Sequence, residues 1–278
     1  MGSVLIKNAT VVTLGEDSRV LENHDVLIEG NLIKKVASNG KAVISGSKVD
    51  KTIDADGMLL MPGFINAHMH FYSSFARGLG KALPSKNFHE VLKNLWWRLD
   101  KKLTHEDSRS SALVACVEAI KRGTTTLIDH HASPGAVRGS LLKVADAVRE
   151  AGLRGSLCYE LSDRDGDEIA KEGMEENISF IKSINEKKDD LIRGLFGLHA
   201  SFTVKEESLK EAVKSIQGID TGFHIHCAED EIDQELTRKK TGMRVVERLH
   251  HAGVLGSKTI CAHCVHVNGK ELDLLAES

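Results

Sequence analysis

Cysteine and proline are scarce in this chain. Its 278 residues include five cysteines and three prolines. A low, odd number of cysteines does not build the disulfide framework of a small secreted protein, so we expect a reducing, cytoplasmic location. The N-terminal segment lacks a basic stretch followed by an apolar one, and we therefore expect no secretory leader.

Long apolar runs and a strong excess of charge are also lacking. No run approaches the ~18 residues that a membrane span needs. The formal net charge is -3, and no block of Lys and Arg is interleaved with aromatic residues, which argues against a nucleic-acid partner. With 41% hydrophobic residues the chain can form a large globular core. We expect a small-molecule substrate, no nucleic-acid or membrane partner, and a surface compatible with a homo-oligomer.

The pattern of the sequence changes near residue 60. Residues 1–60 contain short β-branched runs and a hairpin that turns at Gly30-Asn31, which predicts a small β unit. After residue 60, apolar or β-branched runs alternate with helical patterns. Thr104 and Thr203 each begin a capping-box pattern, and Gly123 and Gly152 are helix-stop signals. The six runs cover residues 58–67, 124–129, 153–161, 194–199, 222–227 and 258–266.

Strand and helix alternation predicts parallel βαβ units, in a doubly wound sheet or in a (β/α)8 barrel. Histidines lie at the ends of most of the predicted strands. In a barrel all those ends meet at one mouth, whereas in a doubly wound sheet only the ends near the switch point meet. We therefore predict an α/β fold with a (β/α)8 barrel of the TIM type. Six strands are found where a barrel has eight, so either the count is wrong or the chain lacks the end of its fold.

Two His-x-His pairs predict a metal site. His68 and His70 follow a Pro-Gly break, and His224 and His226 end a later apolar run. In an extended strand residues i and i+2 point to the same side, so each pair can reach one metal ion. Neutral imidazoles suit zinc, iron or nickel, and a catalytic zinc site keeps one position open for water. His224 could bind metal or only shape the pocket.

Other polar residues follow the strand ends. Glu229 lies three residues after His226, where it could take and return the proton of a water activated by the metal; the alternative is a solvated loop carboxylate. We interpret His199, at the end of the fourth predicted strand, as a polar pocket residue. Residues 129–131 (Asp-His-His) could support the site, contact substrate or belong to an ordinary loop.

Residues 261–266 (Cys-Ala-His-Cys-Val-His) have three interpretations. They could be a structural zinc half-site, a redox dithiol, or a strand end that delivers His263 to the barrel mouth. A second cysteine pair is absent from the sequence, and the segment follows a strand instead of opening a helix. We therefore favour the third interpretation.

The ordered motifs resemble those of the metal-dependent amidohydrolases. Residues 60–70 (Leu-Met-Pro-Gly-Phe-Ile-Asn-Ala-His-Met-His) resemble the opening of that superfamily, and more narrowly of its deaminase and chlorohydrolase branch. Agreement continues through residues 77–78, 123–126, 226–229 and 262–266. Residues 94–100 and 128–134 are similar to those of the SsnA-type aminohydrolases, which are linked to selenium metabolism.

The resemblance implies a hydrolase that acts on C–N bonds and deaminates a purine-, pterin- or pyrimidine-like ring with a metal-activated water. His68, His70 and His226 would bind one divalent metal, with zinc favoured and iron as the alternative. Glu229 would move the proton, and His263 would hydrogen-bond the attacking hydroxide or the developing oxyanion.

The resemblance also implies that His199 contacts substrate, and Asp100 falls where related deaminases carry a substrate-binding Glu. Residues 1–60 would be the N-terminal part of a composite β-sandwich, and residues 61–278 a partial amidohydrolase barrel. Family members carry a metal-binding Asp after strand eight, for which no candidate is found here. We therefore expect the chain to have little activity alone unless another chain supplies the rest. An amidohydrolase that cleaves a cyclic amide or a C–Cl bond, and a non-catalytic metal-binding fragment, are the alternatives.

Overall fold

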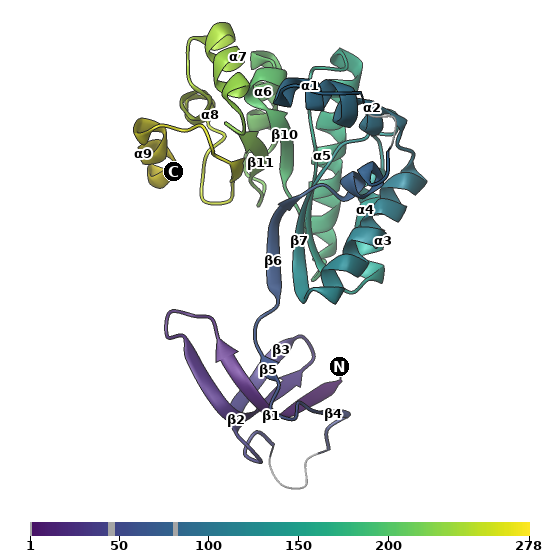
Figure 1. The fold of residues 1–278 in the computed structure, drawn as a ribbon, viewed down its shortest axis with the longest axis vertical. Helices are drawn as coiled ribbons and strands as arrows, with labels where there is room; N and C mark the ends of the chain where they lie inside the picture. Colours follow the sequence, from purple (N-terminus) through teal and green to yellow (C-terminus); the bar gives the residue numbers. More distant parts are fainter. Residues whose placement is uncertain (1, 44–47, 80–82) are drawn as a thin grey trace. The chain divides into compact units, whose positions relative to one another are not determined.

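The structure is a computed structural model that describes residues 2–43, 48–79 and 83–278. The chain divides into two compact units, Met1–Gly63 and Phe64–Ser278 (Figure 1). The division lies close to the change of sequence pattern near residue 60. Each unit has buried hydrophobic clusters of its own, so the two are described separately.

The first unit is a five-stranded sheet. The strands β1 (Ser3–Thr13), β2 (Arg19–Glu29) and β3 (Leu32–Ser38) pair in antiparallel fashion, and β4 (Lys51–Asp54) and β5 (Leu59–Leu60) pair with β1 in parallel. The predicted turn at Gly30-Asn31 joins β2 to β3, and Gly30 has a φ of 62°, which glycine adopts without strain. The buried cluster consists of Ala9, Val11, Val26 and Ala55.

In the described part of the second unit, all strand pairs are parallel. Its strands are β6 (Phe64–Met69), β7 (Thr124–His131), β8 (Arg154–Tyr159), β9 (Ile192–Gly194), β10 (Phe196–Ala200), β11 (Phe223–Cys227) and β12 (Ile260–His263). They form two sheets, with the orders β6-β7-β8-β9 and β10-β11-β12.

A short contact joins these two sheets. Leu161, just after β8, forms a parallel bridge with Leu198 on β10, and the amide of His199 donates to the carbonyl of Leu161 at 2.9 Å. Since only Leu195 separates them, β9 and β10 act as one interrupted strand, and the six strands expected after residue 60 are present. Their order in space follows their order in the chain, as in a barrel and unlike a doubly wound sheet. The α/β barrel prediction is therefore confirmed.

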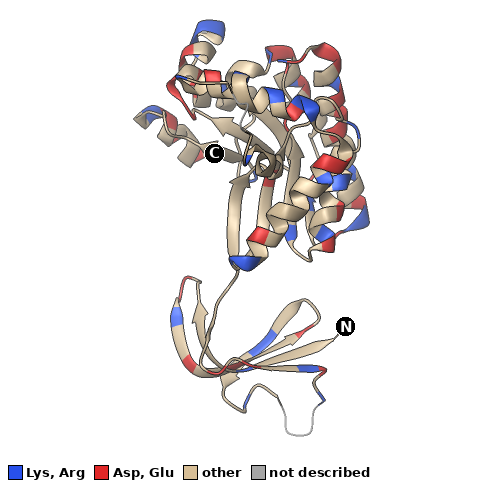
Figure 2. Cartoon of the chain, turned by 45° about the vertical axis from the view of Figure 1, so that its right-hand side comes forward, with Lys and Arg blue, Asp and Glu red and all other residues tan. Residues whose placement is uncertain are grey.

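Helices follow the strands and cover their outer side (Figure 1). The longer ones are α3 (His105–Lys121), α4 (Ser140–Glu150), α5 (Asp167–Lys187), α6 (Glu206–Ser215), α7 (Glu231–Thr241), α8 (Val245–Ala252) and α9 (Gly269–Glu277). Figure 2 shows Lys and Arg interspersed with Asp and Glu along these helices, whereas the strands carry few charges. Among the described residues, no helix has the length and apolar character to cross a membrane.

Short helical turns connect β6 to α3 and β10 to α6. They are η1 (Phe71–Ala76), α1 (Phe88–Val91), η2 (Leu92–Trp96), α2 (Trp97–Leu99), η3 (Asp100–Lys102) and η4 (Ser201–Thr203). The four turns at residues 88–102 run on from one another. The aromatic residues of these turns form part of the wall of the candidate active-site cavity.

One predicted capping box is confirmed and the other is wrong. The Thr104 hydroxyl accepts from the Asp107 amide at 3.2 Å, and the Asp107 carboxylate accepts from the Thr104 amide at 2.9 Å, which contributes about 1 kcal/mol to α3. The helix expected at Thr203 instead begins after Lys205, whose side chain forms no cap. Thr203 ends a 3₁₀ turn, and its hydroxyl lies 2.6 Å from Nδ1 of His199.

The run at residues 58–67, predicted as one strand, is two strands. β5 ends at Leu60 within the first unit, and β6 begins at Phe64 in the second. Pro62 lies between them, and proline has no N–H to donate to a sheet.

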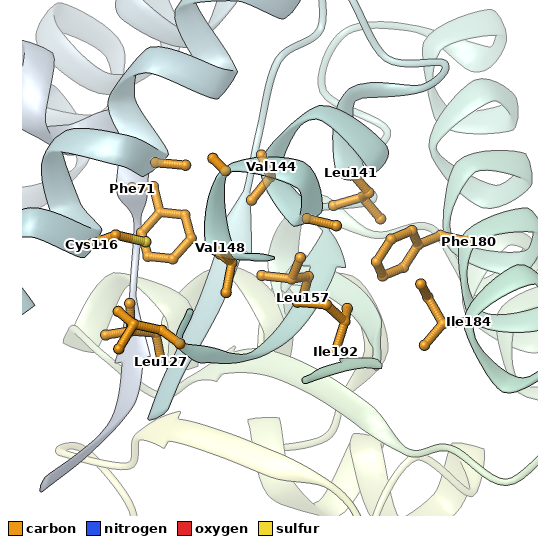
Figure 3. Packing of buried hydrophobic residues seen from close by; sticks show 14 of the residues in the cluster. Phe71, Cys116, Leu127, Leu141, Val144, Val148, Leu157, Phe180, Ile184 and Ile192 are labelled. Carbon is orange, nitrogen blue, oxygen red and sulfur yellow. The ribbon is translucent and has the colours of Figure 1, made fainter. Parts of the chain in front are cut away.

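Two hydrophobic clusters hold the strands of the second unit. The first packs β7 and β8 against α4 and α5 (Figure 3), and the second surrounds β10 and β11. Because packed interiors are rigid, the carboxyl ends of these strands are held in fixed positions. The first cluster includes Phe71, Leu127, Leu141, Leu157, Phe180, Ile184 and Ile192, and the second includes Phe196, Leu198, Leu209, Phe223, Ile225 and Leu249.

Candidate active site

The strand ends bring most of the predicted site residues to one cavity of about 380 Å³. This convergence is what a barrel mouth provides. The polar lining residues are His68 from β6, His70 directly after it, Ser73 in η1, Glu160 after β8, His199 from β10, His226 from β11, Glu229 in the next loop and His263 from β12, together with Arg164.

Another part of the cavity wall is largely aromatic. It comes from the short turns that connect β6 to α3. Flat aromatic faces can stack on a planar ring, and a mostly apolar wall with few polar groups is typical of small-molecule sites. Together with Met69 at the end of β6, the aromatic and apolar lining residues are Tyr72, Phe88, Leu92, Trp96 and Trp97.

Backbone carbonyls fix the ring nitrogens of His70 and His226. Nδ1 of His70 lies 2.6 Å from the carbonyl oxygen of His130, and Nδ1 of His226 lies 2.8 Å from that of His199. A carbonyl only accepts, so both Nδ1 atoms carry hydrogen. Burial lowers the pKa of His70 to about 4 and that of His226 well below its ordinary value, so both rings are neutral at pH 7. Their Nε2 atoms therefore carry no hydrogen. The two atoms lie 3.1 Å apart, so both lone pairs can bind the same ion.

A hydrogen-bond chain orients His68 in the same way. The Cys158 thiol donates to the carbonyl of Asp129 at 3.5 Å, and its sulfur accepts from Nδ1 of His224 at 3.6 Å. Nε2 of His224 then accepts from Nδ1 of His68 at 2.9 Å. Burial lowers the pKa of His68 to about 3, so the ring is neutral, and with its hydrogen on Nδ1 the Nε2 atom is unprotonated. A partner that fixes the second nitrogen in this way is usual for metal-binding histidines.

The potential ligand atoms form two overlapping groups in the described part of the chain. One group is His70, His130, Glu160 and His226, and the other is His68, His226 and His263. Within each group the ligand atoms lie within 4.8 Å of one another. The predicted ligands His70 and His226 thus belong to the first group, and His68 and His226 belong to the second. His226 is common to both groups. Imidazoles with one carboxylate suit zinc or iron.

Glu229 and His263 face each other in the cavity. Oε2 of Glu229 lies 3.5 Å from Nε2 of His263. Burial, with smaller effects of Asp233 and Asp230, raises the pKa of Glu229 to about 7. A carboxyl with that pKa can accept and return a proton near neutral pH. His263 has a φ of 74°, an uncommon backbone conformation for a residue other than glycine.

His199 lies in the cavity wall, whereas Asp100 does not. Nε2 of His199 lies 3.7 Å from Oε1 of Glu160, and burial lowers the pKa of His199 to about 3. Asp100 is fully buried, and its carboxylate accepts a hydrogen bond from the Arg164 guanidinium. Any effect of Asp100 on a substrate would therefore act through Arg164, which lines the cavity.

The sequence interpretation missed a buried ion network. The Arg164 guanidinium binds Asp100, Glu160 at 3.2 Å and Asp165 at 3.0 Å, and it lies 5.2 Å from the ring centre of Trp97. A sequence signal existed for Glu160, which is a carboxylate at the carboxyl end of an otherwise apolar run. Arg164 follows in a loop and is marked by no pattern.

Residues 261–266 end β12 and place His263 in the cavity wall, as the favoured interpretation predicts. Cys261 and Cys264 are free thiols packed against the second hydrophobic cluster.

Sequence comparison identifies related proteins. The profile of the "Amidohydrolase family" matches residues 59–278. The 5-methylthioadenosine/S-adenosylhomocysteine deaminase of Thermoanaerobacter pseudethanolicus is 31% identical over 275 residues, which are 99% of this chain and 61% of that protein. The 5'-deoxyadenosine deaminase of Methanothermobacter thermautotrophicus is 33% identical over 275 residues, 99% of this chain and 60% of that protein. The chain thus spans about three fifths of the length of these curated relatives.

Solved structures share the fold. An adenosine deaminase from Xanthomonas campestris with bound zinc has a TM-score of 0.86 and 22% identity, covering 99% of this chain and 61% of its own. An atrazine chlorohydrolase from Arthrobacter aurescens TC1 complexed with zinc has a TM-score of 0.81 and 23% identity, covering 99% and 63%. At these identities the likeness shows the fold alone.

Proposed function

This chain belongs to the amidohydrolase family, and from that premise we propose that it hydrolyses the C–N bond of an aminated heterocycle and releases ammonia. One observation carries the proposal: unprotonated histidine nitrogens converge in the cavity that Glu229 also lines, and the pKa of Glu229 is raised to about 7. An adenosine-like ring is the favoured substrate class, because relatives with 31% and 33% identity are named as deaminases of adenosine derivatives.

We propose one zinc ion per chain, with iron as the alternative. His68, His70 and His226 each present an unprotonated Nε2, which is the donor that zinc requires. When bound, a divalent ion supplies a Lewis acid that lowers the pKa of a water at the site. Glu229 and His263 line the same cavity as these histidines and would act on that water.

The chain's own residues move the proton and hold the ring. Glu229 takes a proton from the attacking water, whose oxygen bonds to the ring carbon that carries the amino group. The same carboxyl then returns the proton to the amino nitrogen, the C–N bond breaks, and ammonia leaves. His263 donates a hydrogen bond to the attacking oxygen. The aromatic wall and His199 hold the ring in place.

Finer statements remain predictions. The narrower similarity to the SsnA-type aminohydrolases, a cytoplasmic location and a homo-oligomeric state rest on the sequence alone. Cleavage of a C–Cl bond is the weaker alternative, because the chlorohydrolase likeness shows the fold alone.

The test measures zinc content and ammonia release on the purified 278-residue chain. Adenosine, 5'-deoxyadenosine, guanine and cytosine are offered in turn, and ammonia is detected with a coupled dehydrogenase. Glu229→Gln should keep the zinc and lose at least ~100-fold in rate, whereas Glu231→Gln, a nearby solvent-facing carboxylate, should stay active. Equal rates in both variants would contradict the role of Glu229. Zinc retention without ammonia release would agree with the expectation that the chain has little activity alone and with the alternative of a non-catalytic metal-binding fragment.

A further inference from the structure

Two cationic side chains on the outer helices hold the turn that follows β10. The guanidinium of Arg248, on α8, donates to the carbonyl and hydroxyl oxygens of Ser201 and, at 3.0 Å, to the carbonyl oxygen of Val204. The ammonium of Lys240, on α7, donates to the carbonyl oxygen of Phe202. The guanidinium therefore binds the backbone at both ends of the turn η4, and the ammonium binds its middle.

Arg248 suits this role because of its burial and its shape. The residue is 3% exposed, and Glu206 accepts from its guanidinium at 3.4 Å. Hydrogen bonds from a charged donor are about twice as strong as those between neutral groups. The guanidinium also presents its N–H groups in a planar fork, which holds two acceptors at a fixed separation, whereas a single ammonium has no such fork.

The inner side of the turn carries groups of the candidate active site. The hydroxyl of Thr203 lies 2.6 Å from Nδ1 of His199, which lines the active-site cavity. Phe202 packs in one hydrophobic cluster with Trp97 of the aromatic wall, and its ring centre lies 6.2 Å from that of His199. A displacement of the turn would therefore move the side chains that face a substrate ring.

The outer side of the turn borders a second cavity, of about 550 Å³. This cavity is lined by residues 202–204, Lys240 and Arg248, and it shares Trp97 and Arg164 with the active-site cavity. An empty space offers no atoms for the turn to pack against, so the van der Waals contacts that fix a buried strand are missing on this side. The hydrogen bonds from the two cations take their place.

We propose that Arg248 and Lys240 are positioning residues for the substrate. They act through η4, which holds His199 and Phe202 beside the substrate ring, and neither of the two cations lines the active-site cavity itself. The proposal rests on the proposed function, because it concerns the binding of the same ring. The groups that would move the proton come from the ends of β11 and β12, so the chemical step depends less on this turn than binding does.

The kinetics of two Arg248 variants test the proposal on the purified chain. Methionine keeps the length of the side chain but donates no hydrogen bond. In Arg248→Met the KM for the best substrate of the ammonia assay should therefore rise at least ~10-fold, while kcat changes less. Arg248→Lys keeps one donor group and should recover part of the loss. A role in stability alone would lower kcat with the folded fraction and leave KM unchanged, and that result overturns the proposal.

Control variants keep this comparison sharp. Arg149 on α4 also binds two carboxylates, Asp146 and Asp189, and lines neither cavity, so Arg149→Met should keep the KM of wild type. Lys240 is exposed, so Lys240→Met removes the second cation without the risk of misfolding that a buried position carries. It should raise KM by a smaller factor than Arg248→Met, whereas Lys239→Met on the same helix should not.

A measurement without catalysis separates this proposal from the proposed function. Trp96 and Trp97 are the two tryptophans of the chain, and both line the active-site cavity. In Arg248→Met the released turn should expose Trp97, so acrylamide should quench the tryptophan fluorescence more strongly than in wild type or Arg149→Met. If the chain releases ammonia from none of the substrates, the proposed activity is absent and the quenching alone decides. Unchanged KM in an active chain, or unchanged quenching in an inactive one, overturns the proposal.

Discussion

Removal of the Arg164 guanidinium should destabilise the fold far more than removal of an equally paired surface arginine. The Arg164 side chain is 9% exposed and binds three buried carboxylates, those of Asp100, Glu160 and Asp165. Arg164→Ala leaves Asp100 without its cation and removes one partner of Glu160, whereas Asp165 keeps Lys101 at 2.6 Å. Breaking a buried ion pair costs about 3–5 kcal/mol, which is a large part of the roughly 5–15 kcal/mol that stabilises a folded protein.

Proton uptake should limit this cost at low pH. Burial raises the pKa of Asp100 to about 7, although Arg164 opposes that rise. Without Arg164 the folded variant keeps the Asp100 proton to a higher pH than the folded wild type, while the unfolded chains titrate alike near pH 4. The variant's free energy of unfolding therefore falls more steeply as pH rises through 7. The difference between variant and wild type should be larger at about pH 8.5 than at about pH 5.5.

Urea denaturation followed by circular dichroism at both pH values measures this difference. Arg138→Ala is the matched control, because Arg138 also binds two carboxylates, Glu172 and Glu175 at 2.8 Å each, but its side chain is 61% exposed. The free energy of unfolding of that variant should fall by no more than about 1 kcal/mol, because exposed ion pairs contribute little to stability. Equal costs for the two arginines would refute the reasoning, and so would an Arg164→Ala cost that does not change with pH.

Three further predictions concern the site and its support. Burial raises the pKa of Asp129 to about 8, so the folded state keeps a proton that the unfolded state loses; Asp129→Asn should therefore stabilise the metal-free chain against urea increasingly from about pH 4 to pH 8. His224→Leu removes the acceptor of His68 and should lower zinc affinity by ~10–100-fold in a chelator competition, whereas His224→Gln should recover part of it. Thr203→Val removes the 2.6 Å contact with His199 and should lower kcat/KM for ammonia release by roughly tenfold at unchanged zinc content.

The features that could be predicted from the sequence are local ones. Strands of a parallel sheet appear in the sequence as short apolar runs. The alternation of these runs with helical patterns predicted the six strands and their parallel order. The Thr104 cap involves residues three apart in the chain. His68 and His70 stand out because their spacing matches the repeat of a strand.

The features that could not be predicted depend on contacts between distant segments. His130 and Glu160 are 30 residues apart in the chain, and His68 and His224 are 156 apart. No local pattern encodes such a pair. Thr203 illustrates the same limit, because its sequence fits a helix cap but His199 on the preceding strand takes the hydroxyl instead.

The protonation of the metal-binding nitrogens also arises from the fold. The Nδ1 hydrogen of His70 goes to the carbonyl of His130 on the neighbouring strand, and that of His226 goes to the carbonyl of His199. A buried carbonyl at the end of a strand needs a donor once the sheet ladder no longer supplies one. Where neighbouring parallel strands end side by side, the last carbonyl of one strand can accept a hydrogen bond from Nδ1 of a histidine on the next. Each such hydrogen bond leaves Nε2 of that histidine without a hydrogen. A His-x-His pair in the sequence shows that two imidazoles share a face, whereas the adjacent strand end decides which nitrogen of each can bind a metal.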